Sequence, residues 1–466
     1  MKDDSIGREE AGPRADPADR RRAGVQEAWR AAPWPMAGGG PWDVSPAPRP
    51  EPSLASASPV PPILLKILAI VIAALSTAAS AFPPALVSLL LKVFGAGLVL
   101  GLGYLLSKRR VMPGEVRLYF SFLAWGAVIS LLVAVDTAAS LQMAWKIFQS
   151  GLLFWAVAVA HERHPDLRIT MAGIWLIGVL YIYVAHSHQA IALLDETGGR
   201  MTVMGENSNT GGQVFVFAIL AALYLSERAA SWRTKLPLVG SIPVLAYFLL
   251  FTGSRKMLIA TVLVATLWGL TMAKGRNSLA KVVLLLALAL TGYVIVDLWA
   301  ETPMGRRYEY ADKDLEGRSN LYSDGWTLVK EHPEGIGLAN QSRYMNIGEV
   351  HTEFLDVWLT TGAVGAALYF SIYLLTLRRV VRSRDVNMGF SILDRRFFWI
   401  YMALIFWLMF GYSRFKDPLH MVVFGSFVGV FFHLQECYGA IRKLSAPPSC
   451  RGFSVPKDLR SGNAFQ

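Results

Sequence analysis

Arginine and histidine residues in three separated stretches of the chain could bind a phosphate group and activate a hydroxyl. Arg255 follows Ser254, a plausible N-cap for a helix, and Arg318 follows Gly317, where it would lead a second, amphipathic helix. A helix N-terminus offers free backbone N–H groups and the positive end of the helix dipole, and a guanidinium strengthens its attraction for phosphate. Two such ends that converge could therefore hold a pyrophosphate.

His351 could supply a general base. It follows a polar loop, 340–350, and precedes a long apolar segment, so we expect it at a helix N-terminus near a membrane surface. The helix dipole and neighbouring arginines both disfavour an imidazolium there, which leaves a neutral ring able to accept a proton. A polar anchor at the membrane interface is the alternative role. Glu353 cannot orient the ring within a regular helix, because residues two apart face different ways.

Further residues could complete a substrate site. Lys256, Arg343 and Arg414 lie in connections where the charge bias of the chain disfavours basic residues, and phosphate is their natural counter-ion. For any one of them, snorkelling to lipid phosphates or a surface ion pair is the simpler explanation. The collective pattern favours phosphate, because every outer connection after the fifth predicted span carries at least one basic residue. Tyr322 lies on the apolar face of the amphipathic run that starts at Gly317. No set of His and Cys residues is spaced as a metal site, so we expect no metal and no cofactor.

Membrane helices must position these residues. Of the 466 residues, 53% are hydrophobic and only 17% are charged, which requires long segments with almost no charge. Segments able to cross a hydrocarbon core about 30 Å thick recur about twelve times. The predicted spans are 63–81, 85–106, 118–135, 141–160, 169–190, 213–225, 236–251, 256–272, 282–300, 354–377, 397–410 and 419–435. The fold class is therefore all-α, a polytopic membrane helix bundle.

Three regions follow from this pattern. Residues 1–62 are rich in Pro, Ala, Gly, Arg and Asp without an apolar period, which is typical of a disordered tail. Residues 63–438 would form the transmembrane domain, with a helical outer loop at 301–353 between the ninth and tenth spans. Residues 439–466 would form a basic C-terminal tail in the cytoplasm.

Lys and Arg residues concentrate in alternate connections, and cytoplasmic loops retain such residues. The connections 107–117, 227–235, 274–281 and 378–396 are rich in them, whereas 82–84 and 136–140 contain none. With twelve spans, the basic connections and both termini lie in the cytoplasm, and Arg255, Arg318 and His351 lie on the outer side. The net charge of +11 then marks cytoplasmic loops and gives no reason to expect a nucleic acid partner.

Several groups of residues resemble motifs of the bacterial O-antigen ligase and polymerase superfamily. They are Thr252-Gly253-Ser254-Arg255, Gly317-Arg318 followed by Trp326 and His332-Pro333-Glu334-Gly335-Ile336-Gly337, and His351-Thr352-Glu353-Phe354-Leu355 followed by Thr361-Gly362-Ala363-Val364-Gly365. The resemblance covers about Leu64 to Leu434. The stretch Asn207–Asn209 is also similar to the family's pattern, which adds Asn209 to the candidate substrate contacts. Thr352 stands where the family commonly has Asn.

The resemblance implies an inverting, metal-independent glycosyltransferase of the GT-C type in the bacterial inner membrane. Its donor would be a glycan on undecaprenyl pyrophosphate, and its acceptor a sugar hydroxyl, such as that of lipid A-core, at the periplasmic face. Arg255 and Arg318 would bind the pyrophosphate, and His351 would activate the acceptor hydroxyl.

Several reactions remain open. Ligation of the glycan to lipid A-core is the first hypothesis, polymerisation of lipid-linked repeats is the close alternative, and transfer to protein is a third. A secondary transporter belongs to a different class and predicts ionisable residues near mid-membrane and helices broken in matching halves. Apart from Lys146, the unusual charges gather at one face, and no internal repeat is evident.

Overall fold

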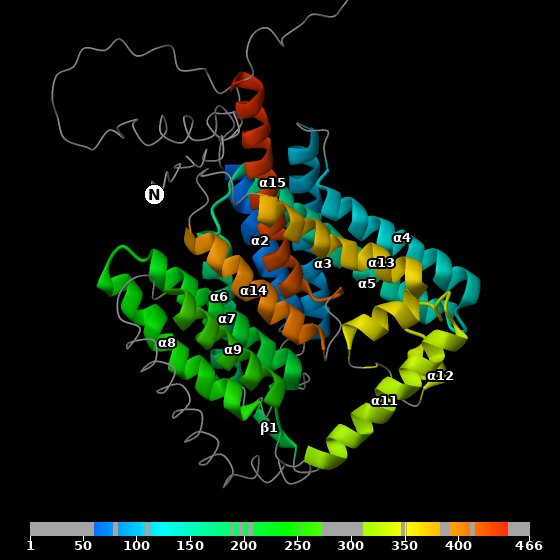
Figure 1. Ribbon diagram of the computed structural model, residues 1–466. Coiled ribbons are helices and arrows are strands. Elements are labelled where there is room, and N and C mark those ends of the chain that lie inside the picture. Colours follow the sequence, from blue (N-terminus) through cyan, green and yellow to red (C-terminus); the bar gives the residue numbers. More distant parts are fainter. Residues whose placement is uncertain are drawn as a thin grey trace, which may run out of the picture. The chain divides into compact units, whose positions relative to one another are not determined.

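The computed structural model describes residues 60–77, 83–107, 112–187, 191–194, 200–203, 208–252, 254–272, 311–345, 350, 352–382, 392–410 and 415–445. The helices are α2 (Val60–Thr77), α3 (Pro84–Ser107), α4 (Gly114–Val133), α5 (Thr137–Arg163), α6 (Arg168–Ser187), α7 (Ser208–Arg228), α8 (Trp232–Phe251), α9 (Arg255–Met272), α11 (Ala311–Glu331), α12 (Gln341–Tyr344), α13 (Glu353–Arg382), α14 (Ile392–Met409) and α15 (Pro418–Ser445) (Figure 1). A short antiparallel hairpin of β1 (Ile191–Leu194) and β2 (Arg200–Val203), which the sequence did not predict, follows α6.

The predicted spans agree with this helical structure. Each predicted span except the ninth coincides with a helix, and the ninth, 282–300, lies outside the described residues, as do most of the predicted tails. Within the described part, 7 helices are long and apolar enough to cross a membrane: α3, α4, α5, α7, α8, α13 and α15. Helices α2 and α6 are apolar but shorter. The described part of the chain is thus a helical membrane bundle apart from the hairpin, while the total of twelve spans remains a prediction.

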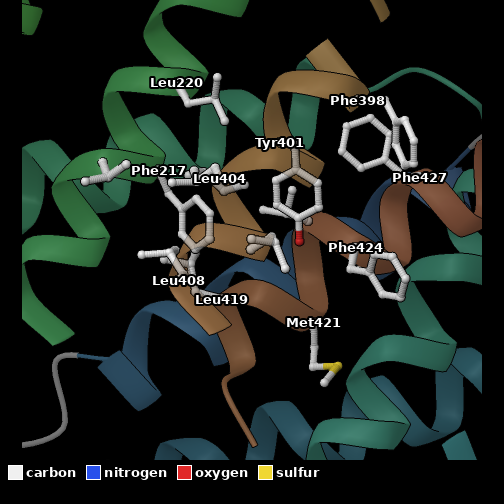
Figure 2. Packing of buried hydrophobic residues seen from close by; sticks show 14 of the residues in the cluster. Phe217, Leu220, Phe398, Tyr401, Leu404, Leu408, Leu419, Met421, Phe424 and Phe427 are labelled. Atoms are coloured by element: carbon white, nitrogen blue, oxygen red, sulfur yellow. The ribbon is translucent and has the colours of Figure 1, made fainter. Parts of the chain in front are cut away.

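The core is built around α15. Gly425 and Gly429 let its backbone approach α5, because a Cβ at Gly425 would lie 2.9 Å from the Phe154 carbonyl oxygen. Aromatic rings fill the space toward α14, where Tyr401 packs on Phe427 with ring centroids 5.2 Å apart (Figure 2). Small residues at a helix interface permit close van der Waals packing, which holds helices together where lipid removes the hydrophobic driving force.

Helix α13 folds back on itself at Gly362, whose φ of 67° and ψ of −176° suit only glycine. Phe354 and Phe370, on either side of the break, stack with centroids 5.1 Å apart. In a straight helix these two residues would be about 24 Å apart. The predicted span 354–377 therefore lies within an apolar helix, as expected, but that helix is broken at Gly362, which the sequence did not predict. Hydropathy missed the break because the residues on both sides of the glycine are apolar.

The segment after α11 stabilises this turn. The carbonyl oxygens of Leu359 and Thr360, left without partners where the first part of α13 ends, accept the backbone N–H groups of Ile336 (2.9 Å) and Gly337 (3.0 Å). The indole N–H of Trp125 on α4 donates to the Thr361 carbonyl oxygen at 2.8 Å. Two motifs of the resemblance, HPEGIG and TGAVG, thus form one structural junction.

Candidate functional site

The N-termini of α7 and α9 meet through a side-chain hydrogen bond. The Ser254 hydroxyl donates to Oδ1 of Asn209 at 2.6 Å and accepts the Met257 backbone N–H at 3.4 Å. These contacts confirm Ser254 as the N-cap of α9 and make Arg255, which is partly buried, the first residue of that helix. Gly212 permits the close approach, because a Cβ there would lie 2.8 Å from Cγ of Met257.

The N-terminus of α15 lies beside that of α7. Oδ1 of Asp417 caps α15 by accepting the backbone N–H groups of Leu419 (3.0 Å) and His420 (3.3 Å). Its other oxygen, Oδ2, accepts a hydrogen bond from the side-chain amide of Gln213 on α7. One carboxylate therefore both caps α15 and ties the two helix ends together.

This end of α15 lies inside the bundle. The Ser150 hydroxyl, at the middle of α5, donates to the Lys416 carbonyl oxygen at 3.2 Å. The Tyr119 hydroxyl of α4 donates to the Phe415 carbonyl oxygen at 2.6 Å. The segment before α15, which the sequence indicated as an outer loop, therefore returns into the bundle before the helix starts.

The start of α13 and the end of α14 border the same region. The Phe354 ring lies 5.3 Å from that of Phe410, which follows α14. The Lys256 ammonium donates to the Leu408 carbonyl oxygen, and the Trp407 indole donates to the Lys256 carbonyl oxygen at 3.1 Å. Lys256 thereby binds the negative end of the α14 dipole.

Four helix N-termini, those of α7, α9, α13 and α15, thus lie in one neighbourhood with the C-termini of α8 and α14, and Lys256 binds the C-terminus of α14. Their free N–H groups and dipoles create a positive potential that favours an anion such as a phosphate. Arg255 adds a guanidinium at this place. The fold-back of α13 also forms a partly open apolar pocket of about 420 Å³ lined by Phe354, Trp358, Ala363, Ala366, Ala367 and Phe370.

The other predicted substrate contacts have partners within the protein. Arg343 forms an ion pair with Asp136 at 2.8 Å, and the Ala139 backbone N–H together with this guanidinium lowers the pKa of the Asp136 carboxyl. Tyr322 packs in a small apolar cluster between α11 and α13. Asn209 accepts the Ser254 hydroxyl.

Two predicted residues lie outside the described part of the chain, and a third is placed differently from the prediction. His351 and Arg414 lie outside the described residues. Arg318 was expected to lead a helix, but α11 begins at Ala311. The residues from 311 to 316 favour helix strongly enough to extend it backwards, and Gly317 is tolerated in its interior. Arg318 therefore lies two turns along α11, where the free N–H groups of a helix start are absent.

Sequence reasoning assigned no role in the site to three polar residues that the structure places close to the converging helix ends. Glu353, Asp356 and His420 are almost completely buried. Asp356 accepts a hydrogen bond from the side-chain amide of Gln341 at 2.5 Å. Ionisable residues at the start of apolar segments were the available signal, because such residues are costly in a membrane protein interior.

Comparison with known protein families gives a match over part of the chain. Residues 240–370 match the family model described as O-antigen ligase, and this segment contains Arg255, Arg318 and His351. No curated protein matches the chain. The match supports an O-antigen ligase-related family, and together with the apolar helices it indicates a multi-pass bacterial membrane protein.

Proposed function

We propose that the chain transfers a glycan from undecaprenyl pyrophosphate to a sugar hydroxyl of lipid A-core at the periplasmic face of the inner membrane, with both of its termini in the cytoplasm. The observation that carries the proposal is the convergence of four helix N-termini beside Arg255, within and next to the segment that matches the O-antigen ligase family. This arrangement suits the negative charge of a pyrophosphate.

The proposed mechanism needs charge stabilisation and one base. As the bond between the anomeric carbon and the pyrophosphate breaks, Arg255 and Arg318 stabilise the negative charge on the leaving group, and losing one such donor commonly costs about 10²–10³ in rate. His351 removes the proton of the acceptor hydroxyl, a contribution of about 10²–10⁴. Attack from the opposite face inverts the configuration. The apolar pocket of α13 is suited to hydrocarbon rather than sugar.

One observation favours a second function, secondary transport. Transporters bind solutes at broken helices in the membrane, and α13 is broken at Gly362. The turn at Gly362 is filled by backbone of the 333–337 segment, however, so the break leaves no cavity at the glycine itself. The family match also favours the enzyme.

The test is an electrophoretic profile of cell-surface polysaccharide in a deletion strain. Loss of every capped form of lipid A-core supports ligation, retention of a single capped repeat supports polymerisation, and an unchanged profile contradicts both. Arg255→Ala, Arg318→Ala and His351→Ala should each fail to restore the wild-type profile at normal protein level in the membrane. Full complementation by all three variants would overturn the assigned roles.

A further inference from the structure

Five buried polar side chains form a continuous hydrogen-bonded chain next to the converging helix ends. The Tyr369 hydroxyl donates to Oε1 of Glu353 and lies 2.9 Å from the Tyr373 hydroxyl. Nε2 of His420 lies 3.0 Å from the Tyr373 hydroxyl, and Nδ1 lies 2.7 Å from the Tyr401 hydroxyl. None of the five is more than 7% exposed. The chain therefore connects the first residue of α13 to α14 and α15 without contact with bulk solvent.

The carboxylate sets the direction of the hydrogen bonds. An ionised Glu353 only accepts, so Tyr369 donates to it and Tyr373 donates to Tyr369. His420 must then carry a proton on Nε2 to donate to Tyr373, and Nδ1 accepts from Tyr401 when the ring is neutral. Every hydroxyl and the imidazole thus point a proton toward Glu353. The donated hydrogen bonds stabilise the ionised carboxylate and set how readily Glu353 accepts a proton.

Shape alone does not require these groups. The turn of α13 is already held by backbone hydrogen bonds to Leu359 and Thr360, and rings of Phe122 and Phe415 surround Tyr369. Phenylalanine at 369 would satisfy that packing without placing a polar group in a membrane interior, where burial of such groups is costly. The presence of a carboxylate and an imidazole joined by two hydroxyls in this interior indicates a role in proton handling.

We propose that Glu353, Tyr369, Tyr373, His420 and Tyr401 form a proton relay that takes up, at Glu353, the proton that the acceptor hydroxyl loses during glycan transfer. The inference rests on the proposed function and adds positioning residues to it. The acceptor oxygen keeps the electron pair of its broken O–H bond and forms a bond to the anomeric carbon. The bond from that carbon to the pyrophosphate oxygen breaks at the same time, and its electron pair leaves with the pyrophosphate. The base passes the proton to Glu353, whose affinity for it is set by the hydrogen bonds that run from His420 through Tyr373 and Tyr369. The proton returns by the same route to the pyrophosphate product or to water.

Other ionisable side chains beside the relay have their own partners. Tyr119 of α4 lies near Glu353, but its hydroxyl donates to the carbonyl oxygens of Phe415 and Ile147. Asp356 accepts from Gln341, and Asp417 caps α15 and accepts from Gln213. The relay is thus distinct from these contacts, and a change at Tyr373 interrupts it between its two titratable ends.

The first test is the pH profile of transfer by the purified full-length protein in lipid nanodiscs, with an undecaprenyl pyrophosphate-linked glycan and lipid A-core. Tyr373→Phe should lower kcat about tenfold or more and shift the pH midpoint of kcat by at least one unit, with KM unchanged. Glu353→Gln should lower kcat about 10²-fold, the scale of a lost proton-transfer group. Thermal unfolding of each variant verifies that it is folded.

A matched control lies at the opposite end of the bundle. Tyr224 is buried and its hydroxyl donates to the carboxylate of Asp394 at 2.6 Å, so Tyr224→Phe removes the same kind of hydrogen bond away from the relay. It should leave the pH midpoint unchanged. If wild type transfers glycan and Tyr373→Phe has the same pH midpoint of kcat as wild type, the relay is overturned and the proposed function stands. Absence of transfer by wild type counts against the proposed function instead.

A second readout does not depend on activity. Infrared difference spectra of the purified protein across a pH titration should contain a carboxylic acid C=O band that is lost in Glu353→Gln. The midpoint of that band should move in Tyr373→Phe and stay in place in Tyr224→Phe. A Glu353 band whose midpoint is the same in Tyr373→Phe as in wild type contradicts the proposal, because it shows that the hydrogen-bonded chain does not act on the carboxylate.

Discussion

One hydroxyl, that of Ser254, holds both a helix end and a neighbouring helix at the candidate site. Ser254→Ala removes the N-cap of α9 and the hydrogen bond to Asn209. The loss of a cap costs about 1 kcal/mol, and Arg255 loses its fixed position. We expect a fall in thermal stability together with a fall in glycan transfer of about tenfold or more, measured by complementation and by transfer in nanodiscs.

The control for this prediction is another cap. Ser231 caps α8 by accepting the Thr234 backbone N–H at 3.3 Å, in one of the basic connections far from the site. Ser231→Ala should cost a similar amount of stability and leave transfer unchanged. Equal loss of transfer in both variants would mean that helix stability, and not the position of Arg255, limits the reaction.

The sequence was sufficient for the part of the site that depends on local chemistry. Ser254 and Arg255 could be assigned because an N-cap and the residue after it are adjacent in the chain. Glu353 and His420 could not, because the two hydroxyls that connect them lie beyond the break in α13 and approach Glu353 only through the fold-back. The ion pair of Arg343 could not be predicted either, because its partner Asp136 lies far away in sequence and close in space.

At the scale of single elements, Gly362 decides the course of α13. Gly362→Ala would place a Cβ against the Glu334 carbonyl oxygen in a backbone conformation that costs about 1–3 kcal/mol for other residues. The variant should unfold at a lower temperature in detergent, lose protection of the α13 turn from hydrogen exchange, and fail to support transfer.

A second glycine is the control that separates the backbone strain at Gly362 from the ordinary effect of alanine on helix propensity. Gly95 lies within α3, and an added Cβ there meets nothing within 4 Å. Gly95→Ala should be neutral or stabilising by about 0.5–1 kcal/mol, as expected for a helix interior. Unchanged unfolding of Gly362→Ala would contradict the fold-back of α13.

A buried ion pair joins the start of α4 to the end of α13. Glu115 is fully buried, and its Oε1 lies 3.0 Å from Nε of Arg379. Arg379→Leu leaves a carboxylate buried without its counter-ion and should cost about 3–5 kcal/mol, seen as a lower unfolding midpoint in detergent. The double variant Glu115→Leu with Arg379→Leu should recover much of this loss. A double variant as unstable as the single one would show that the two side chains act independently.

The sequence predicted helices correctly where a long apolar composition determines them. It failed where a single residue or contact determines the course of the chain. Long apolar segments identified the helices, because a membrane core demands them whatever the packing. The break at Gly362 and the start of α11 at Ala311 depend on contacts or helix extension that a hydropathy average cannot detect. The hairpin of β1 and β2 was missed because its strands are only 4 residues long.

For the whole molecule, the distribution of Lys and Arg predicts which ends of the helices face the cytoplasm. Ala230, between α7 and α8, and Ser342, in α12, are both exposed and lie at opposite ends of this topology. In a parent with Cys437 and Cys450 replaced by serine, Ser342→Cys should react with a membrane-impermeant maleimide in intact cells. Ala230→Cys should react only after the inner membrane is permeabilised. Labelling of Ala230→Cys but not Ser342→Cys in intact cells would place the candidate site on the wrong side for a lipid-linked periplasmic donor and remove the basis for the proposed reaction. Labelling of both in intact cells would contradict the predicted cytoplasmic position of the α7–α8 connection.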